Sequence, residues 1–144
     1  MLNTKQIGNI TEIECMLAFI KMGYNVLTPY GDCERYDFVV DINNHLYRIQ
    51  VKTSHLSQDE SYIEFRTSNK TTREGVFVQH AYTEDQIDYF MTYYNNQAYL
   101  VPVQESTTSQ KRLRFLPPKN NQTQGINFAQ DYELERQVFK ILNR

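Results

Sequence analysis

The sequence of 144 residues contains no tryptophan and only two cysteines, five glycines and four prolines. Cys15 and Cys33 form no CxxC pair or metal-finger spacing, so we expect reduced thiols rather than a disulfide framework or a zinc module. The chain has no long apolar run and no signal-peptide pattern, which favours a soluble, cytoplasmic protein without a membrane partner. Positive net charge is also lacking: the formal charge is −2, which argues against a generic nucleic-acid binder.

The chain does contain enough apolar material for one packed domain. Hydrophobic residues make up 40% of the sequence, which is typical of a globular rather than a disordered chain. A length of 144 residues fits one domain with its own core, and no linker is long enough to divide it. We therefore expect a single domain over residues 1–144.

The clearest structural prediction is a β-hairpin over residues 36–54. Two strands that alternate apolar and polar residues flank Asn43-Asn44, and asparagine tolerates the positive φ that tight hairpin turns require. One face carries apolar or aromatic side chains, namely Phe38, Val40, Ile42, Tyr47, Ile49 and Val51. The other face is nearly all polar and holds Asp37, Val39, Asp41, Arg48, Gln50 and Lys52.

The turn at Asn43-Asn44 also sets the register of the hairpin. It places Asp37 opposite Gln50 and makes Lys52 the diagonal neighbour of Asp37. Opposed Cβ atoms lie roughly 5 Å apart and diagonal ones roughly 7–8 Å apart, so a carboxylate, an amide oxygen and an ammonium should converge. Such a group suits a divalent cation and a phosphate, although a hairpin with a merely solvated polar face gives the same pattern.

Helix and strand patterns surround the hairpin. Residues Thr4–Met22 are predicted to form a helix capped by Thr4, with an apolar stripe toward the core that comprises Ile10, Ile13, Leu17 and Ile20. Further strands are expected over 24–28, 62–67, 88–94, 98–103 and 111–116, and a last helix over 132–142. Residues 69–75 are expected to form a basic loop. The predicted class is therefore α/β or α+β, with a mixed sheet flanked by helices.

Two residues of the first helix are candidates for a site. Glu12 lies at the border of the apolar stripe, so its carboxylate can lie at the edge of the core. Gly8 costs about 1 kcal/mol against alanine inside a helix. A ligand that approaches the backbone would explain that cost, and a fraying first turn would explain it nearly as well.

Positive charge gathers in two segments that contain no acidic residue. The first, residues 65–73, holds Arg66, Lys70 and Arg73; the second, residues 106–130, holds Lys111, Arg112, Arg114 and Lys119. In an otherwise acidic chain, these segments could contact the phosphates of DNA. Charge runs of this kind are also common on solvated faces.

Together these residues supply what phosphodiester hydrolysis needs. Carboxylate and amide oxygens suit Mg²⁺, which lowers the pKa of a bound water, and a lysine stabilises developing negative charge. The candidate catalytic residues are Glu12, Asp37, Gln50 and Lys52. No Ser/His/Asp or Cys/His nucleophile arrangement stands out in the sequence.

The motif Gly8-x-x-x-Glu12, followed by Tyr36-Asp37 and Gln50-Val51-Lys52, resembles the PD-(D/E)xK nuclease superfamily. A closer likeness, to the branch of group I intron homing endonucleases, is carried by Leu27-Thr28-Pro29-Tyr30-Gly31, Arg48-Ile49-Gln50-Val51-Lys52-Thr53, Asp88-Tyr89-Phe90, Tyr99-Leu100-Val101-Pro102 and Ala129-x-Asp131-Tyr132. The likeness covers most of the chain. It implies a restriction-endonuclease-like core, in which a helix precedes a mixed sheet with a catalytic hairpin.

The resemblance implies Mg²⁺-dependent cleavage of double-stranded DNA, with Mn²⁺ as a substitute metal. It assigns Glu12, Asp37 and Gln50 to the metal and Lys52 to catalysis. It also implies a homodimer or homotetramer, associated with the nucleoid when bound to DNA. Tyr36 replaces a nominal proline at a loose position, whereas Gln50 replaces an acid and removes one negative charge from the metal site.

Three functions remain open on the sequence alone. The leading hypothesis is a site-specific endonuclease of the homing type. A structure-selective nuclease, similar to a Holliday-junction resolvase, would share the helix glutamate and the hairpin. A DNA-binding module with a decayed nuclease site would account for the neutral residue at Gln50.

Overall fold

The computed structural model describes residues 1–31, 34–106 and 109–144, with the backbone alone for residues 69–73 and 77–79. The described residues form two α-helices, α1 (Thr4–Lys21) and α2 (Leu134–Leu142), with 3-10 turns at Val103–Glu105 and Ala129–Tyr132. The strands are β1 (Asn25–Leu27), β2 (Phe38–Ile42), β3 (His45–Val51), β4 (His55–Leu56), β5 (Tyr62–Arg66), β6 (Ser68–Arg73), β7 (Val76–Ala81), β8 (Tyr89–Tyr94), β9 (Gln97–Pro102) and β10 (Gln110–Arg114). The predicted α+β class is confirmed. Neither described helix is long and apolar enough to cross a bilayer.

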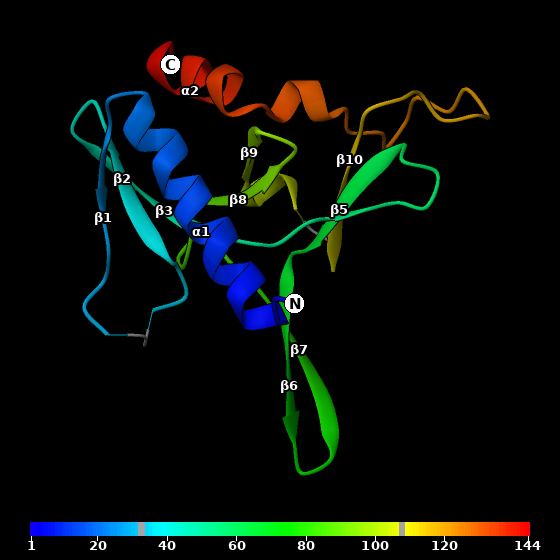
Figure 1. Cartoon of the computed structure of the whole chain (residues 1–144), viewed down its shortest axis with the longest axis horizontal. Helices are drawn as coiled ribbons and strands as arrows, with labels where there is room; N and C mark the ends of the chain where they lie inside the picture. The colour runs from blue at the N-terminus through cyan, green and yellow to red at the C-terminus, as the bar shows by residue number, and fades with distance from the viewer. Residues whose placement is uncertain (32–33, 107–108) are drawn as a thin grey trace.

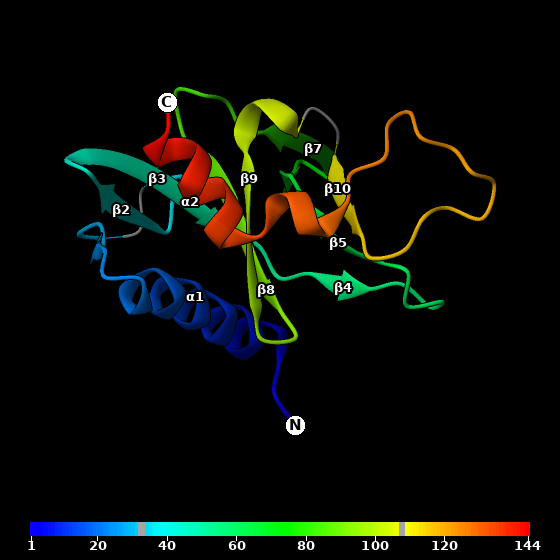
Figure 2. The same ribbon diagram turned by 90° about the horizontal axis from the view of Figure 1, so that it is seen from above.

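A mixed five-stranded sheet, in the order β1-β2-β3-β8-β9, forms the centre of the fold. Strands β3 and β8 run parallel, and the other neighbours are antiparallel. A three-stranded sheet, β10-β5-β4, lies away from β1 and β2 in both views (Figures 1 and 2). Strands β6 and β7 pair as a separate ribbon that projects from the body (Figure 1).

Paired asparagines close both hairpins of the central sheet. Asn43 and Asn44 have φ of 53° and 66°, and Asn95 and Asn96 have φ of 49° and 65°. Two positive values in succession are what the type I′ turn requires, and its twist matches that of the flanking strands. The register from Ile42–His45 to Phe38–Ile49 is the predicted one.

Apolar side chains pack on both sides of the central sheet. The cluster beneath α1 and α2 includes Phe19, Phe38, Ile49, Met91 and Leu134. The second cluster joins the central and three-stranded sheets and is formed by residues that include Ile63, Phe65, Phe90, Val101 and Leu113. Strands β8 and β9 are therefore covered on both faces.

The apolar stripe of α1 that was predicted to face the core is exposed instead. Ile10, Ile13, Leu17 and Ile20 are 41%, 60%, 43% and 53% exposed. The buried residues are Thr11, Cys15 and Phe19, on the opposite side of the helix. The prediction was wrong because α1 carries apolar residues on both faces, so the stripe did not identify the packed one. The cap is Asn3 rather than Thr4, since the Asn3 side chain accepts from the Gln6 N–H at 2.9 Å.

Residues 69–75, which were predicted to be a loop, form most of β6 and its turn. Glu74 and Gly75 have φ of 53° and 79°, so this hairpin also closes through two positive-φ residues. The hydroxyl-rich and amide-rich sequence of β6 lacks the apolar alternation that would have predicted a strand. Cys33 lies outside the described residues.

Candidate functional site

Asp37 lies directly before β2, where the ladder between β2 and β3 ends. The pairing stops at Phe38–Ile49, and beyond it the Val51 N–H donates to Oδ2 of Asp37 at 2.7 Å. The N–H of Asp37 itself donates to the Ile49 carbonyl at 2.8 Å. The carboxylate thus takes the place of a strand acceptor. This bond fixes the carboxylate at the open end of the hairpin, as the register predicted.

Glu12 of α1 and Asp37 line the same cleft, of about 280 Å³. Burial raises the pKa of both carboxyl groups, and the negative charge of Asp37 raises that of Glu12 further. The Val51 hydrogen bond and the charge of Lys52 act in the opposite direction on the pKa of Asp37. Two half-buried carboxylates whose charged forms are disfavoured would be stabilised by a bound cation.

Lys52 does not line this cleft, although its charge acts on Asp37. Its Nζ donates to the Tyr82 hydroxyl at 3.2 Å and lies 4.9 Å from the centroid of the Tyr82 ring. Tyr82 belongs to the cluster on the side away from α1. Lys52 lines a second cleft, of about 510 Å³, together with Arg66 and Gln110. The structure therefore brings Glu12 and Asp37 together, and Lys52 acts on Asp37 through its charge.

The donor set fits a hard divalent cation. Within residues 1–31, 34–106 and 109–144, no group of three His, Cys, Asp or Glu side chains could hold a metal ion. The carboxylate oxygens in the cleft are those of Glu12 and Asp37, whereas Gln50 is not among the residues that line it and its Nε2 donates to the Val51 carbonyl at 3.3 Å. One or two carboxylates, with waters and substrate phosphate completing the shell, are a common arrangement for Mg²⁺.

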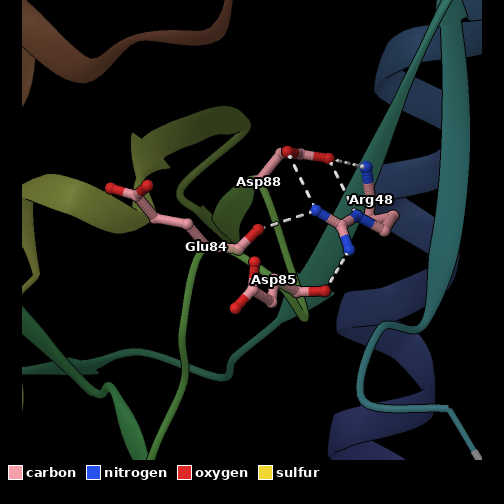
Figure 3. Close-up of polar contacts among 4 residues, drawn as sticks. All are labelled: Arg48, Glu84, Asp85 and Asp88. Atoms are coloured by element: carbon pink, nitrogen blue, oxygen red, sulfur yellow. Dashed lines mark hydrogen bonds and ion pairs between the residues drawn. The ribbon is translucent and has the colours of Figure 1, made fainter.

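Arg48 anchors β3 to the segment that follows Tyr82 (Figure 3). Its Nε forms an ion pair with Oδ2 of Asp88 at 3.1 Å, and its terminal nitrogens donate to the carbonyls of Glu84, at 2.8 Å, and Asp85. The Arg48 N–H also donates to Oδ2 of Asp88 at 2.8 Å. Because Glu84 and Asp85 come shortly after Tyr82, these bonds help to hold the ring that contacts Lys52.

The outward face of the three-stranded sheet is basic and aromatic. Cross-strand pairing sets Arg66 against Gln110, Arg112 against Glu64, and Arg114 against Tyr62. The guanidinium carbons of Arg112 and Arg114 lie 4.8 Å and 5.4 Å from the Tyr62 ring centroid. A third cleft, of about 760 Å³, includes both arginines and shares Gln110 with the cleft that Lys52 lines. We call the surface from Lys52 past Arg66 to Arg114 the basic track.

Lys111 also lines the third cleft, but its ammonium is not part of the basic track. Neighbouring residues of a strand point to opposite faces, and Lys111 is only 6% exposed. Its Nζ donates to the Glu105 carbonyl at 2.7 Å and lies 5.0 Å from the Tyr132 ring centroid, and burial lowers its pKa. This placement corrects the predicted DNA contact of Lys111, whose ammonium is bonded inside the protein.

The remaining predicted contact residues are scattered. Lys119 is exposed on the loop after β10. A Cβ at Gly8 would meet no atom within 4 Å, so packing does not require glycine there. Lys70 and Arg73 fall in β6, where the structure describes the backbone alone. The sequence does not predict the bonds of Arg48, because its carbonyl and carboxylate partners lie 36 to 40 residues further along the chain.

Comparisons with known proteins identify the family and the fold. A family model described as PD-(D/E)XK endonuclease matches residues 2–135. The chain is similar in structure to the bacterial homing endonuclease I-Ssp6803I, with a TM-score of 0.79, 24% sequence identity and coverage of 99% of both chains. At that identity the likeness establishes the fold. None of the curated proteins matches the chain.

Proposed function

Because this chain belongs to the PD-(D/E)XK endonuclease family, whose members generally use divalent metal ions, we propose that it is a Mg²⁺-dependent, site-specific homing endonuclease for double-stranded DNA. The likeness of fold to a homing endonuclease supports the homing type. The observation that carries the proposal is the Asp37 carboxylate, fixed by the Val51 N–H beside Glu12 at the open end of the β2–β3 hairpin.

Each residue of the site has a defined part in this proposal. A bound divalent cation would lower the pKa of a water and neutralise phosphate charge. Glu12 and Asp37 would hold the cation as ionised carboxylates, with Gln50 as a neutral oxygen donor. Lys52, oriented by the Tyr82 hydroxyl, would donate to the phosphate or to the attacking water. Mn²⁺ would substitute because it accepts the same oxygen ligands.

DNA would lie along the basic track, with Arg66, Arg112 and Arg114 toward its phosphates. The β6–β7 ribbon would reach a groove, since the major groove of B-DNA admits a two-stranded ribbon. Figure 1 supports this part of the proposal because the ribbon projects freely from the body. Lys70 and Arg73 occur within the ribbon's sequence, and Lys119 would add a more distant contact.

Cutting both strands requires two sites, so we propose a homodimer, or a homotetramer made of two dimers. The exposed stripe of Ile13, Leu17 and Ile20 on α1 is the surface for the second copy. A helix stripe can pack against its own two-fold copy, and monomers rarely expose contiguous apolar surface of this kind. Ile13→Glu should therefore give a smaller species in sedimentation velocity, whereas Lys140→Gln on α2 should not. An unchanged species would remove α1 from the interface.

Cleavage of a random-sequence duplex library in Mg²⁺ tests the function. Wild type should cut a defined subset of sequences, and Asp37→Ala should bind these duplexes without cutting them. Arg136→Ala is the matched control, because Arg136 forms an exposed ion pair with Asp131 beside α2. It should cut as wild type does.

Two other results would each replace the proposal. Strong preference for four-way junctions, independent of sequence, would indicate a structure-selective nuclease. DNA binding without cleavage in Mg²⁺ or Mn²⁺, with no effect of Lys52→Ala, would indicate a decayed site. The neutral Gln50 is the observation that favours that second alternative.

A further inference from the structure

Arg35 has hydrogen-bonding capacity that the described protein does not use. Its Nε and Nη2 are buried and have no hydrogen-bond partner among the described residues. The guanidinium stacks on Tyr82, with Cζ 3.9 Å from the ring centroid. Buried donors nearly always have a partner, and a buried charged donor without one is destabilising. We therefore look for the missing hydrogen-bond partner in a bound ligand.

The two unused atoms lie on one edge of the guanidinium. Nε and Nη2 carry parallel N–H groups, and this edge matches two oxygens of a single phosphate or carboxylate. None of the ion pairs among the described residues involves Arg35. The unused edge thus matches an anion with two oxygens.

The position of Arg35 indicates which anion this is. Arg35 precedes Asp37 by two residues, and it shares the Tyr82 ring with Lys52, whose Nζ lies 4.9 Å from the same centroid. Two cations on one ring, beside the carboxylate that ends the β2–β3 ladder, form a positive site where the reacting phosphate would lie.

Arg48 shows what a structural arginine looks like in this protein. Its Nε, Nη1 and Nη2 all donate, to Asp88, Asp85 and Glu84 respectively. Arg35 lies in the same region of the molecule and leaves a whole edge unused. Arg48 therefore has a structural role, whereas the unused edge of Arg35 is free to bind a ligand.

We propose that Arg35 binds the DNA phosphate that is cut, through the edge formed by Nε and Nη2, with Tyr82 as the platform that orients the guanidinium. This inference rests on the proposed function and adds a substrate-binding residue to it. Because the edge is closed to solvent in the free protein, binding requires the guanidinium to turn outward along the ring. The turned arginine would then add a fixed positive charge to that of Lys52 as the phosphate gains negative charge.

The test compares Arg35→Ala and Arg35→Lys with wild type. Single-turnover cleavage in Mg²⁺, on a duplex recovered from the library, should fall about 100-fold in Arg35→Ala. For binding to a random-sequence duplex in Ca²⁺, the slope of log affinity against log salt concentration should fall by about one. Arg35→Lys should restore the salt slope but not the cleavage rate, because lysine lacks the fork. Arg136→Ala should change neither.

Thermal unfolding of the free protein separates this role from a structural one. Arg35→Ala removes buried donors that have no partner and also the stacking on Tyr82, so the two effects offset and its melting temperature should stay close to that of wild type or exceed it. A lower melting temperature with normal cleavage per folded molecule would overturn the proposal. Unchanged cleavage and salt slope in Arg35→Ala would also overturn it. If wild type binds DNA but never cuts it, the proposed function fails, and the salt slope still decides whether Arg35 contacts phosphate.

Discussion

The two hairpins of the central sheet, β2–β3 and β8–β9, are built alike and used differently. Both close through paired asparagines with positive φ. Residues 89–92 of β8 and 98–101 of β9 are all buried, whereas β2 alternates between buried and half-buried side chains. The two hairpins differ in how many of their faces are packed against apolar side chains. An apolar cluster lies on each side of β8–β9, and β2–β3 buries only the face toward α1.

The candidate site lies at the β2–β3 hairpin, which keeps one face open. The β2–β3 ladder ends with a carboxylate in place of a backbone acceptor, and the β8–β9 ladder runs in register from Tyr94–Gln97 to Tyr89–Pro102. The same turn chemistry thus gives the candidate site in one case and a scaffold in the other. Substitutions at the end of β2–β3 should remove activity and spare stability, and substitutions in β8–β9 should do the reverse.

The largest effect is expected from Asp37→Asn. The amide oxygen can still accept from the Val51 N–H, but the negative charge at the site is lost. Single-turnover cleavage should fall about 1,000-fold or more, while binding of the duplex in Ca²⁺ persists. A variant that keeps a tenth of the wild-type rate would show that this hairpin end is not the reacting site.

Comparison with Asp37→Asn should also show how the Asp37 carboxyl group makes the stability of wild type depend on pH. Burial raises the pKa of Asp37 above its ordinary 3.8. In the window above 3.8 and below the raised pKa, the folded state therefore binds more protons than the unfolded state, and this contribution to stability falls as pH rises. The melting temperature of metal-free wild type, relative to Asp37→Asn, should decrease with rising pH through that window, and saturating Mg²⁺ should offset the decrease. A relative increase would contradict the raised pKa.

Met91→Ala tests the scaffold hairpin. The Met91 side chain is fully buried on β8, so its truncation should lower the free energy of unfolding by about 2–5 kcal/mol. The Met91 carbonyl, which accepts from the Lys52 N–H at 2.9 Å, belongs to the backbone and is retained. Urea unfolding measures the loss, and cleavage per folded molecule should stay near that of wild type. If Met91→Ala lost cleavage but kept the stability of wild type, β8–β9 would not be only a scaffold.

Local signals explain what the sequence predicted correctly. Paired asparagines and strict alternation determined the β2–β3 register and the place of Asp37 at its end, because both depend on neighbouring residues. The pleat should also have separated Lys111 from Arg112, since consecutive strand residues cannot share a face. The single-domain prediction and the catalytic roles stay predictions.

Tertiary relations explain what the sequence did not predict. The packed face of α1 could not be identified, because apolar residues occupy both sides of that helix. The bonds of Arg48 and the stacking of Arg35 on Tyr82 join residues far apart in the chain. Neither relation has a periodicity or turn signal that would mark it in the sequence.

Gln50→Glu tests the difference between the two hairpins through a smaller expected effect, on the Mg²⁺ dependence of cleavage. An added carboxylate should lower the Mg²⁺ concentration for half-maximal cleavage by about tenfold if Gln50 is a ligand. Gln97 is a control in the other hairpin, because its Nε2 donates to the Ala98 carbonyl as that of Gln50 does to Val51; it also donates to Oε2 of Glu135 at 3.0 Å. Gln97→Glu sets a carboxylate against Glu135, so it is measured per folded molecule, and it should leave the Mg²⁺ dependence unchanged. If Gln50→Glu also leaves it unchanged, Gln50 does not contact the metal.

The smallest effect is expected from Thr92→Val on β8. Thr92 is fully buried, and its Oγ1 has no hydrogen-bond partner among the described residues. Valine keeps the shape without the unpartnered hydroxyl, so the free energy of unfolding in urea should rise by about 1 kcal/mol with cleavage unchanged. Arg35 also holds unpartnered buried donors, beside the site rather than in the scaffold, and Arg35→Ala should gain or keep stability while losing cleavage. If Thr92→Val also lost cleavage, an unpartnered polar atom would not distinguish a ligand-binding group from a defect of packing.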